Sequence, residues 1–256
     1  MILVCKLCGQ EKKLVVAHII PRSFYDPLRE GGQIPVIITD QPGVYIQKSR
    51  TGVYDREILC GACERKLSAW DDYAYKFLMG NVSDHAYIMH RDKRVAYNLG
   101  RCDYNKLKLF FMSVLWRAGA SKQPFFKNVQ LGPYNEDLRA RILAADPGRV
   151  EDYAVALSRF DAPPPNVGML NPCRNEYGGV NHYQLYLGGY MAIVKVTNKK
   201  PPEFFECLYI APGTDVIVLI LEFETSKEFQ VMANVVKRAL LRGNIKRRGN
   251  SDKNPG

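Results

Sequence analysis

Two Cys-x-x-Cys pairs carry the clearest chemistry in this sequence, Cys5 with Cys8 and Cys60 with Cys63. A turn of this kind directs both sulfurs at one ion, and two such turns complete a tetrahedral thiolate site with no position open to water. The pattern therefore predicts one structural zinc ion per chain. The alternative is four unrelated buried thiols, which the repeated spacing disfavours.

The remaining cysteines are Cys102, Cys173 and Cys207, which have no close partner in sequence and are expected to be small buried hydrophobes. The chain has no stretch of eighteen uncharged apolar residues, so no membrane span is expected. The apolar stretch at the start is too short for a secretory signal and runs directly into the first cysteine pair. These features predict a cytoplasmic protein, in which paired cysteines indicate a metal before a disulfide.

One histidine, His18, lies between the two cysteine pairs in the segment Val-Val-Ala-His-Ile-Ile-Pro-Arg at 15–22. An isolated histidine in an apolar strand is more often a satisfied core residue than a functional one. Its place between two predicted metal-binding turns favours a functional role.

Three segments together resemble the HNH (His-Me finger, ββα-metal) endonucleases, in particular their four-cysteine zinc-binding subgroup. They are Cys-Lys-Leu-Cys-Gly at 5–9, Ala-His-Ile-Ile-Pro at 17–21 and Glu-Ile-Leu-Cys-Gly-Ala-Cys-Glu at 57–64. The resemblance covers only the N-terminal segment 1–80. It implies a zinc-stabilised ββα module and metal-dependent hydrolysis of phosphodiester bonds, with Mg²⁺ or another divalent ion for the chemistry. The nucleic acid is expected to be DNA, with RNA left open.

The resemblance also implies roles for three residues. His18 would be the general base, Glu64 would hold the catalytic ion at the start of a helix, and Asp55 would orient the histidine or reach the ion. The alternatives are structural: His18 is a core histidine, Glu64 is a first-turn glutamate that interacts with the helix dipole, and Asp55 is a turn residue. The sequence departs from the family at Ala17, where many members have a metal ligand, and it lacks the final histidine. Asp71 and Asp72, two turns along the helix, could substitute as ligands.

The chain has 36 Lys and Arg against 26 Asp and Glu, a formal net charge of +10, which favours an anionic partner. The residues expected to contact phosphates are Arg22, Lys48, Arg50, Arg56, Arg65 and Lys66. The leading hypothesis is an HNH-like nuclease, and the resemblance implies a link to phage defence or a mobile element. The alternative is a catalytically degenerate zinc-binding protein that binds nucleic acid or regulates a larger system.

The expected fold class is α+β, with four parts. Residues 1–80 form the zinc-binding module, 81–162 are mostly helical, 163–241 form a small antiparallel sheet with a terminal helix, and 242–256 are a basic disordered tail. The 163–241 part could dock a protein partner. The connector at 162–166, Ala followed by three prolines and Asn, is the expected internal boundary.

Apolar spacing and breakers predict the individual elements. Strands are expected at 14–20, 35–39, 43–47, 84–90, 183–196, 204–210 and 216–223. Helices are expected after Cys63 up to Gly80, after a cap at Asp103, at 135–145, at 149–160, and after Thr225 or Ser226 up to Leu241.

Overall fold

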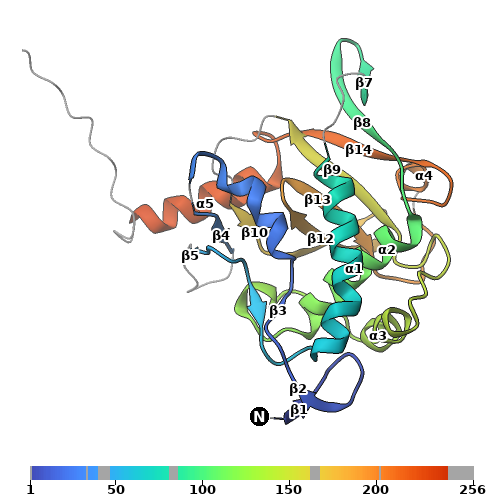
Figure 1. The fold of residues 1–256 in the computed structure, drawn as a ribbon. Helices are drawn as coiled ribbons and strands as arrows, with labels where there is room; N and C mark the ends of the chain where they lie inside the picture. The colour runs from blue at the N-terminus through green and yellow to red at the C-terminus, as the bar shows by residue number, and fades with distance from the viewer. Residues whose placement is uncertain are drawn as a thin grey trace, which may run out of the picture.

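The computed structural model describes residues 2–32, 34–39, 47–80, 86–161, 168–201 and 203–241. The chain is α+β, as expected, with one large sheet and several helices (Figure 1). The predictions for 43–46, the connector at 162–166, His85 and the tail at 242–256 lie outside the described residues. The predicted domain boundaries stay predictions.

Short strands and one long helix make up the N-terminal segment 1–80. The strands expected at 14–20 and 35–39 are confirmed in shortened form. The elements are β1 (Ile2–Val4), β2 (Glu11–Lys13), β3 (Ala17–His18), a 3-10 helix (Arg22–Gly32), β4 (Val36–Ile38), β5 (Gln47–Lys48), β6 (Tyr54–Asp55) and α1 (Gly61–Leu78). Helix α1 buries one face, with Leu67, Trp70, Ala74 and Leu78 spaced at three and four residues.

Helix α2 (Tyr104–Ala120) is the centre of the molecule. The Asp103 carboxylate accepts a hydrogen bond from the Lys106 backbone N–H at 3.1 Å, which confirms the predicted cap. Every residue from 107 to 118 is buried, so the helix has no solvent face. It packs against α1 and against α3 (Tyr134–Ala144), which confirms the helix expected at 135–145.

The large sheet has seven strands in the order β11-β12-β13-β9-β14-β8-β7. All neighbours are antiparallel except the parallel pair β9 and β14. The strands are β7 (Tyr87–His90), β8 (Lys93–Arg101), β9 (Val155–Asp161), β11 (Cys173–Tyr177), β12 (Val180–Leu187), β13 (Tyr190–Lys195) and β14 (Asp215–Glu222). The expectation of a small C-terminal sheet after a mostly helical region is therefore wrong, because three strands come from 87–161.

Three element predictions are wrong, each for a local reason. The helix expected at 149–160 is strand β9, whose first four residues are all buried and so lack the alternation of a surface strand. The segment 204–210, which was expected to be a strand, begins instead within the short helix α4 (Glu203–Glu206). The single strand expected at 183–196 is the hairpin β12–β13, which turns at Gly188 and Gly189 with φ of 57° and 91°.

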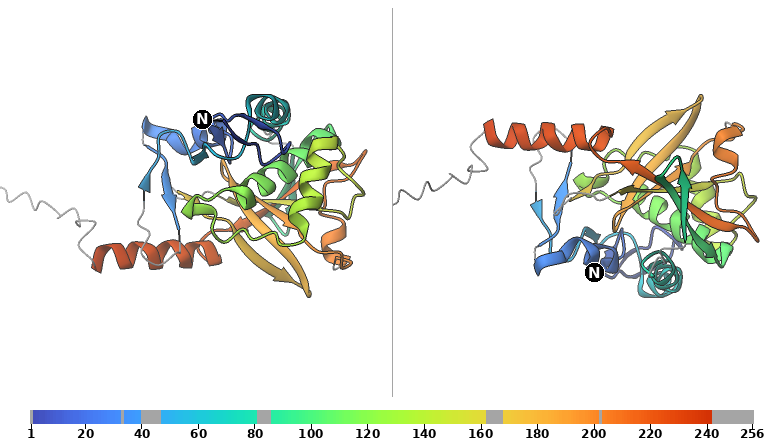
Figure 2. Two further views of the ribbon diagram at one scale, coloured as in Figure 1. Left: turned by 90° about the horizontal axis from the view of Figure 1, so that it is seen from below. Right: turned by 90° about the horizontal axis from the view of Figure 1, so that it is seen from above.

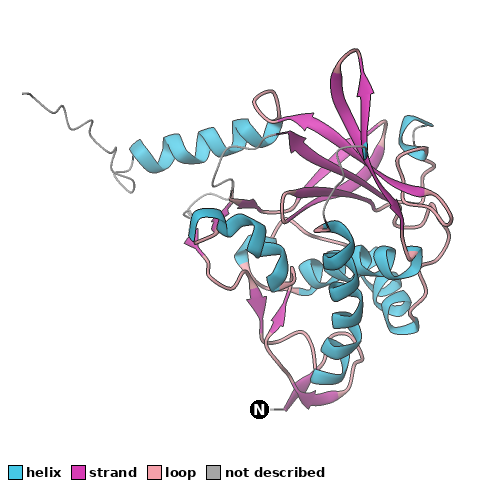
Figure 3. Ribbon diagram, turned by 45° about the horizontal axis from the view of Figure 1, so that its top comes forward, coloured by secondary structure: helices cyan, strands magenta, loops and turns pink. Residues whose placement is uncertain are grey.

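Helices cover the sheet unevenly. Helices α1, α2 and α3 gather beneath it (Figure 3), and one buried core joins Leu67 of α1, Phe110 of α2 and Leu185 of β12. Helix α5 (Lys227–Leu241) lies on the side opposite α1 (Figure 2). Its predicted cap is confirmed, since the Ser226 hydroxyl accepts from the Phe229 N–H at 3.1 Å.

Helix α5 also covers the junction between the N-terminal segment and the large sheet. There, β10 (Met169–Leu170) pairs in parallel with β4. None of the helices in the described ranges is long and apolar enough to cross a membrane.

Candidate functional site

The four cysteines of the two pairs meet in space. The sulfurs of Cys5, Cys8, Cys60 and Cys63 all lie within 4.8 Å of one another. A tetrahedral zinc–thiolate site with bonds of about 2.3 Å requires sulfur separations of about 3.8 Å, and Cys8 and Cys60 are 4.0 Å apart. The cluster is therefore a candidate four-cysteine metal site, as the spacing predicted.

Local backbone geometry builds both turns of this cluster. Gly9 follows the first pair with a φ of 71°, a conformation that favours glycine, and its N–H donates to the Cys5 carbonyl at 2.8 Å. Cys60 is the N-cap of α1, and its backbone N–H donates to the Cys5 sulfur at 3.3 Å. Burial raises the pKa of Cys60, but hydrogen bonds from the Cys63 backbone N–H and from the three other thiols outweigh it and lower that pKa to about 7. Burial, together with the neighbouring thiols, raises the pKa of Cys63, so Cys60 is the thiol of the cluster favoured as the thiolate, the form that binds metal.

Helices α2 and α3 hold the cysteine cluster against the rest of the fold. Lys6 donates to the Ala120 carbonyl at the end of α2 at 2.6 Å, and Arg139 of α3 donates to the Leu7 carbonyl at 2.8 Å. Both contacts involve residues next to the clustered cysteines. The cysteine cluster is therefore coupled to the helices that support the sheet.

His18 lies on a two-residue strand whose partner is β6. Ala17 pairs with Asp55 and His18 with Tyr54, and the His18 and Tyr54 rings meet edge to face with centroids 6.1 Å apart. The half-buried His18 ring bonds the Thr51 backbone, while its Nε2 atom is buried and has no hydrogen-bond partner among the described residues. Nε2 is therefore the ring nitrogen that is available to accept a proton.

Electrostatics keep the His18 ring neutral. Desolvation by burial lowers its pKa below the usual 6.5, and the positive charges of Arg22 and Arg117 lower it further. The bond to the Thr51 backbone and the negative charge of Asp71 oppose this shift without reversing it. A neutral imidazole with a free nitrogen is what a general base requires at neutral pH.

Glu64 is the second predicted site residue with an unsatisfied atom. It lies in the first turn of α1, and its Oε2 atom is buried without a partner among the described residues. Burial raises the pKa of this carboxyl; the Arg117 charge opposes that effect, while the Asp71 charge adds to it. A buried carboxylate oxygen without a donor costs free energy unless a cation or a hydrogen bond satisfies it.

An ion pair between two helices connects His18 to α1. Arg117 of α2 is fully buried and donates to both oxygens of Asp71, at 2.9 and 2.7 Å. The same guanidinium donates to the His18 carbonyl at 3.0 Å. Glu64 precedes Asp71 by seven positions on the same face of α1, about 10 Å along the axis. The charges of Arg117 and Asp71 therefore act on both His18 and Glu64.

Asp55 is placed away from this group. Successive strand residues point to opposite faces, so Asp55 and Ala17 share the face opposite to that of His18 and Tyr54. Its carboxylate is 4% exposed and accepts hydrogen bonds from the Ser121 hydroxyl at 2.8 Å and from backbone N–H groups of Glu57 and Lys122. Although burial raises it, these bonds bring the pKa of Asp55 below its usual value. The structure gives Asp55 a role in joining β6 to the end of α2.

The predicted phosphate-binding residues separate into three groups. Arg22 is exposed and close enough to act on His18, and the Arg56 guanidinium lies 5.7 Å from the ring centroid of Tyr54, the partner of His18. Lys66 instead donates to the Leu143 carbonyl near the end of α3, a structural role. The remaining residues are exposed and are Lys48, Arg50 and Arg65.

Within the described ranges, the four cysteines are the only group of three or more His, Cys, Asp or Glu side chains positioned for one ion. Ala17 is fully buried, Asp71 is occupied by Arg117, and Asp72 is exposed. A catalytic ion at this site would therefore have Glu64 as its protein carboxylate. Mg²⁺ is commonly held by one or two carboxylates together with substrate phosphates and water.

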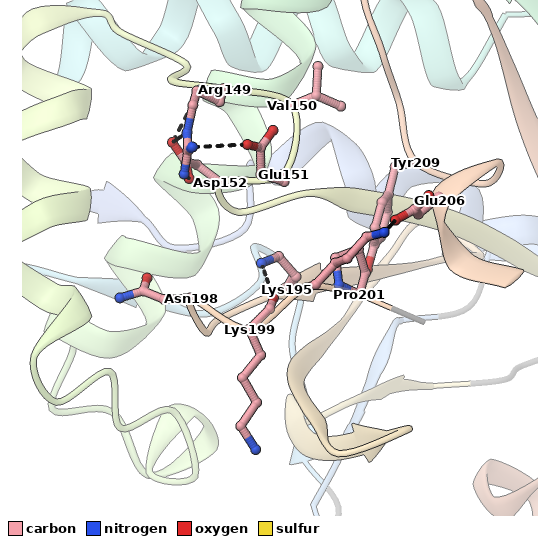
Figure 4. Close-up of a pocket in the computed structure, with 11 residues that line it drawn as sticks. Arg149, Val150, Glu151, Asp152, Lys195, Asn198, Lys199, Pro201, Glu206 and Tyr209 are labelled. Carbon is pink, nitrogen blue, oxygen red and sulfur yellow. Dashed lines mark hydrogen bonds and ion pairs between the residues drawn. The ribbon is translucent and has the colours of Figure 1, made fainter. Parts of the chain in front are cut away.

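A second polar region, a pocket of about 610 Å³, lies between the turn before β9 and the loop after β13. Figure 4 shows Arg149 turned toward Asp152 and Glu151, with both ion pairs at 3.1 Å. Lys200 pairs with Glu206 at 3.5 Å. Lys195 and Lys199 donate to backbone carbonyls. Each charged side chain lining this pocket thus has a partner within the protein, and the pocket provides no unpaired charge for a ligand.

Sequence reasoning missed Thr51, whose backbone bonds the His18 ring, because no motif marks a backbone contact from a loop. Arg117 carries no sequence motif either, because its buried ion pair with Asp71 depends on how α2 packs against α1. No protein-family model, curated protein or solved structure matches this chain. The resemblance to HNH endonucleases therefore stays a prediction from the sequence.

Proposed function

We propose that this protein is a metal-dependent nuclease of HNH type that hydrolyses phosphodiester bonds, with DNA as the expected substrate. The observation that carries the proposal is the pair of unsatisfied buried atoms, Nε2 of His18 and Oε2 of Glu64, both acted on by the charges of Arg117 and Asp71. Buried polar atoms without partners are rare in native proteins, and a catalytic role or a bound ion is one explanation for them.

His18 would act as the general base. Its Nε2 would accept a proton from water while the resulting hydroxide attacks phosphorus and the bond to the leaving sugar oxygen breaks. The lowered pKa keeps the ring unprotonated. Arg117 supports this residue indirectly, because its bond to the His18 carbonyl holds the strand against α1 and α2.

Glu64 would hold the divalent ion. When bound, such an ion supplies Lewis-acid stabilisation of the charge that develops on the phosphate. Oε2 of Glu64 has the hard oxygen that Mg²⁺ or Mn²⁺ prefers, and the substrate would complete the coordination. In this proposal, Asp55 positions β6 and is not a catalytic group.

The cysteine cluster would hold a structural zinc ion. Cys60 and Cys63 lie at the start of α1, directly before Glu64, while the other pair precedes the His18 strand. Zinc bound to all four sulfurs would therefore fix the distance between the two proposed catalytic residues. Exposed Arg22 and Arg56 beside His18 would receive the phosphate backbone.

Incubation of the zinc-loaded protein with supercoiled plasmid tests this proposal. Nicking is expected with Mg²⁺ or Mn²⁺ and not with EDTA. Glu64→Gln, which keeps the shape of the side chain but not its charge, should abolish the ion-dependent nicking. Asp72→Asn, on the exposed face of the same helix, should leave nicking unchanged. Equal nicking by wild type and Glu64→Gln would contradict the role of Glu64.

A nucleic-acid-binding protein without catalysis is the second candidate. Ala17 is buried where many HNH enzymes have a metal ligand, and no second ligand cluster is preformed in the described ranges. In that case, the protein would bind DNA with the same affinity in EDTA and in Mg²⁺ and would cleave nothing. The link to phage defence stays a prediction.

A further inference from the structure

The hairpin formed by β7 and β8 stands clear of the body of the protein. Strand β8 pairs with β14 only up to Ala96, which lies opposite Leu219, whereas its pairing with β7 continues to Lys93 opposite His90. Beyond Ala96, β14 keeps β9 as its neighbour. The sheet therefore divides at Ala96, and the tip at 88–95 projects as a free two-stranded ribbon, seen at the top of Figure 1.

A tight turn closes the tip. Arg91 and Asp92 both have positive φ, 46° and 62°, the pattern of a type I′ turn. The type I′ turn matches the twist of the two strands, and the register of the ribbon shifts by one residue between Ile88 and Met89. Gly is usual in such turns, and here two charged residues occupy both central positions instead.

The ribbon carries an unbalanced positive charge. Arg91, Lys93 and Arg94 face a single acid within the tip, Asp92, and all four are exposed. The one ion pair to the body, between Lys93 and Glu222, is 3.4 Å long and exposed to solvent, so it neutralises little. Within the part of the chain that the structure describes, neither Arg91 nor Arg94 pairs with a carboxylate.

Aromatic packing orients one of these cations. The Arg94 guanidinium lies 4.1 Å from the centroid of the Tyr87 ring, and Tyr87 in turn packs on Tyr97 with centroids 6.0 Å apart. Two apolar side chains, Ile88 and Met89, are 41% and 54% exposed on the same ribbon. The tip thus combines held positive charge with uncovered apolar surface.

We infer that the β7–β8 ribbon is a nucleic-acid-binding arm that contacts the phosphate backbone of a duplex through Arg91, Lys93 and Arg94. A two-stranded ribbon fits the major groove of B-DNA, about 12 Å wide, and the cations of the turn and of β8 then face the phosphates. Ile88 and Met89 contact the groove floor or sugars. The inference rests on the proposed function and deepens it, because it names a second part of the protein, separate from His18, that binds the substrate.

Binding of a fluorescent 25-base-pair duplex by the full-length, zinc-loaded protein tests the arm. The test variant is Arg91→Ala/Lys93→Ala/Arg94→Ala. The matched control is Arg174→Ala/Lys199→Ala/Lys200→Ala, which removes the same charge from exposed positions around the opposite sheet edge, β11, and the loop after β13. The arm variant should bind at least about tenfold more weakly at 0.1 M salt, and the slope of log K against log salt should fall by about 2 to 3.

The control triple variant should bind within about twofold of wild type, and both variants should keep the wild-type melting temperature because all six side chains are exposed. Equal weakening of duplex binding in the two variants, or no binding by wild type, would overturn the inference that the ribbon binds nucleic acid. Tighter binding of an acidic polypeptide than of duplex DNA would also overturn it. If binding depends on the arm but the protein does not nick plasmid, only the nuclease proposal is rejected. If the protein nicks plasmid and the arm variant binds DNA as well as wild type, only the role of the arm is rejected.

Discussion

Arg117 of α2 forms a bidentate, buried ion pair with Asp71 of α1, and its guanidinium also bonds the carbonyl of His18. One side chain therefore connects the central helix, the helix that follows the cysteine cluster and the strand of the proposed general base. The two partners lie 46 positions apart in sequence, and their pairing joins the N-terminal segment to the rest of the fold.

Replacing Arg117 by Met should lower the free energy of unfolding by about 3–5 kcal/mol, because the Asp71 carboxylate would be left buried without its partner. Urea unfolding followed by circular dichroism measures this change. The double variant Arg117→Met/Asp71→Leu should recover most of the loss, since no charge would then be stranded. A loss that is the sum of the two single changes would show that the two side chains do not interact.

Substitution of a cluster cysteine should remove the metal. Cys60→Ser is expected to reduce zinc from one ion per chain to none and to unfold the N-terminal segment, because metal binding and folding form one equilibrium in such sites. Cys207→Ser provides the matched control, as that thiol is exposed and outside the cluster. Elemental analysis and thermal unfolding report the two effects. Wild-type zinc content in Cys60→Ser would contradict the four-sulfur site.

Activity should depend on pH through His18. Because its pKa in the folded protein is lowered from 6.5, the ring is neutral at pH 7 and becomes protonated only at a lower pH. The value of kcat/KM should therefore level off toward neutral pH and fall tenfold per pH unit below an apparent pKa that is less than 6.5. Zinc content must be measured at each pH, since thiolate sites release metal in acid. An apparent pKa above 6.5 would assign the titration to another group.

The same shift predicts how stability changes with acid. An unfolded chain binds the His18 proton near pH 6.5, while the folded protein binds it only at lower pH. The contribution of His18 to the free energy of unfolding therefore falls as the pH decreases through 6.5 and levels off below the folded pKa. His18→Gln should remove this part of the pH dependence in urea titrations. An unchanged pH profile in that variant would show that His18 is not the group responsible.

Asp55→Ala should affect stability and not catalysis. The change removes an acceptor from the Ser121 hydroxyl and from two backbone N–H groups, at a cost of about 2 kcal/mol or more. Ser121→Ala, which removes one of these bonds, should cost less. Nicking by the folded Asp55→Ala protein should match wild type, measured at a temperature where both are folded. A loss of more than a hundredfold there would restore the catalytic role that the sequence suggested.

Local signals in the sequence were enough to predict the cysteine cluster and the main helices. Cys-x-x-Cys spacing, the cap at Asp103 and the apolar face of α1 each act over a short stretch of chain, so no tertiary information was needed. The seven-stranded sheet could not be predicted in this way. Strand β9 is buried on both faces in the middle of the sheet, and its pairing with β14 joins segments about sixty positions apart.

The candidate site, too, was only partly predictable from local signals. His18 and Glu64 were identifiable from their positions relative to the cysteines, but their shared neighbours Arg117 and Asp71 depend on how α2 packs against α1. Asp55 shows most clearly what local signals cannot predict, because the strand register alone decides which face of the strand pair it occupies. A one-residue difference in register would have placed it beside His18.

Plasmid nicking by His18→Ala in the presence of Mg²⁺ or Mn²⁺ tests the central claim most directly. Loss of the general base should slow nicking by about 10²- to 10⁴-fold, while zinc stays at one ion per chain and duplex binding stays at the wild-type level. Tyr54→Phe, which keeps the neighbouring ring, serves as the control and should nick normally. Nicking by His18→Ala within a factor of about two of wild type would contradict the account, because such a small change is below the contribution of any general base.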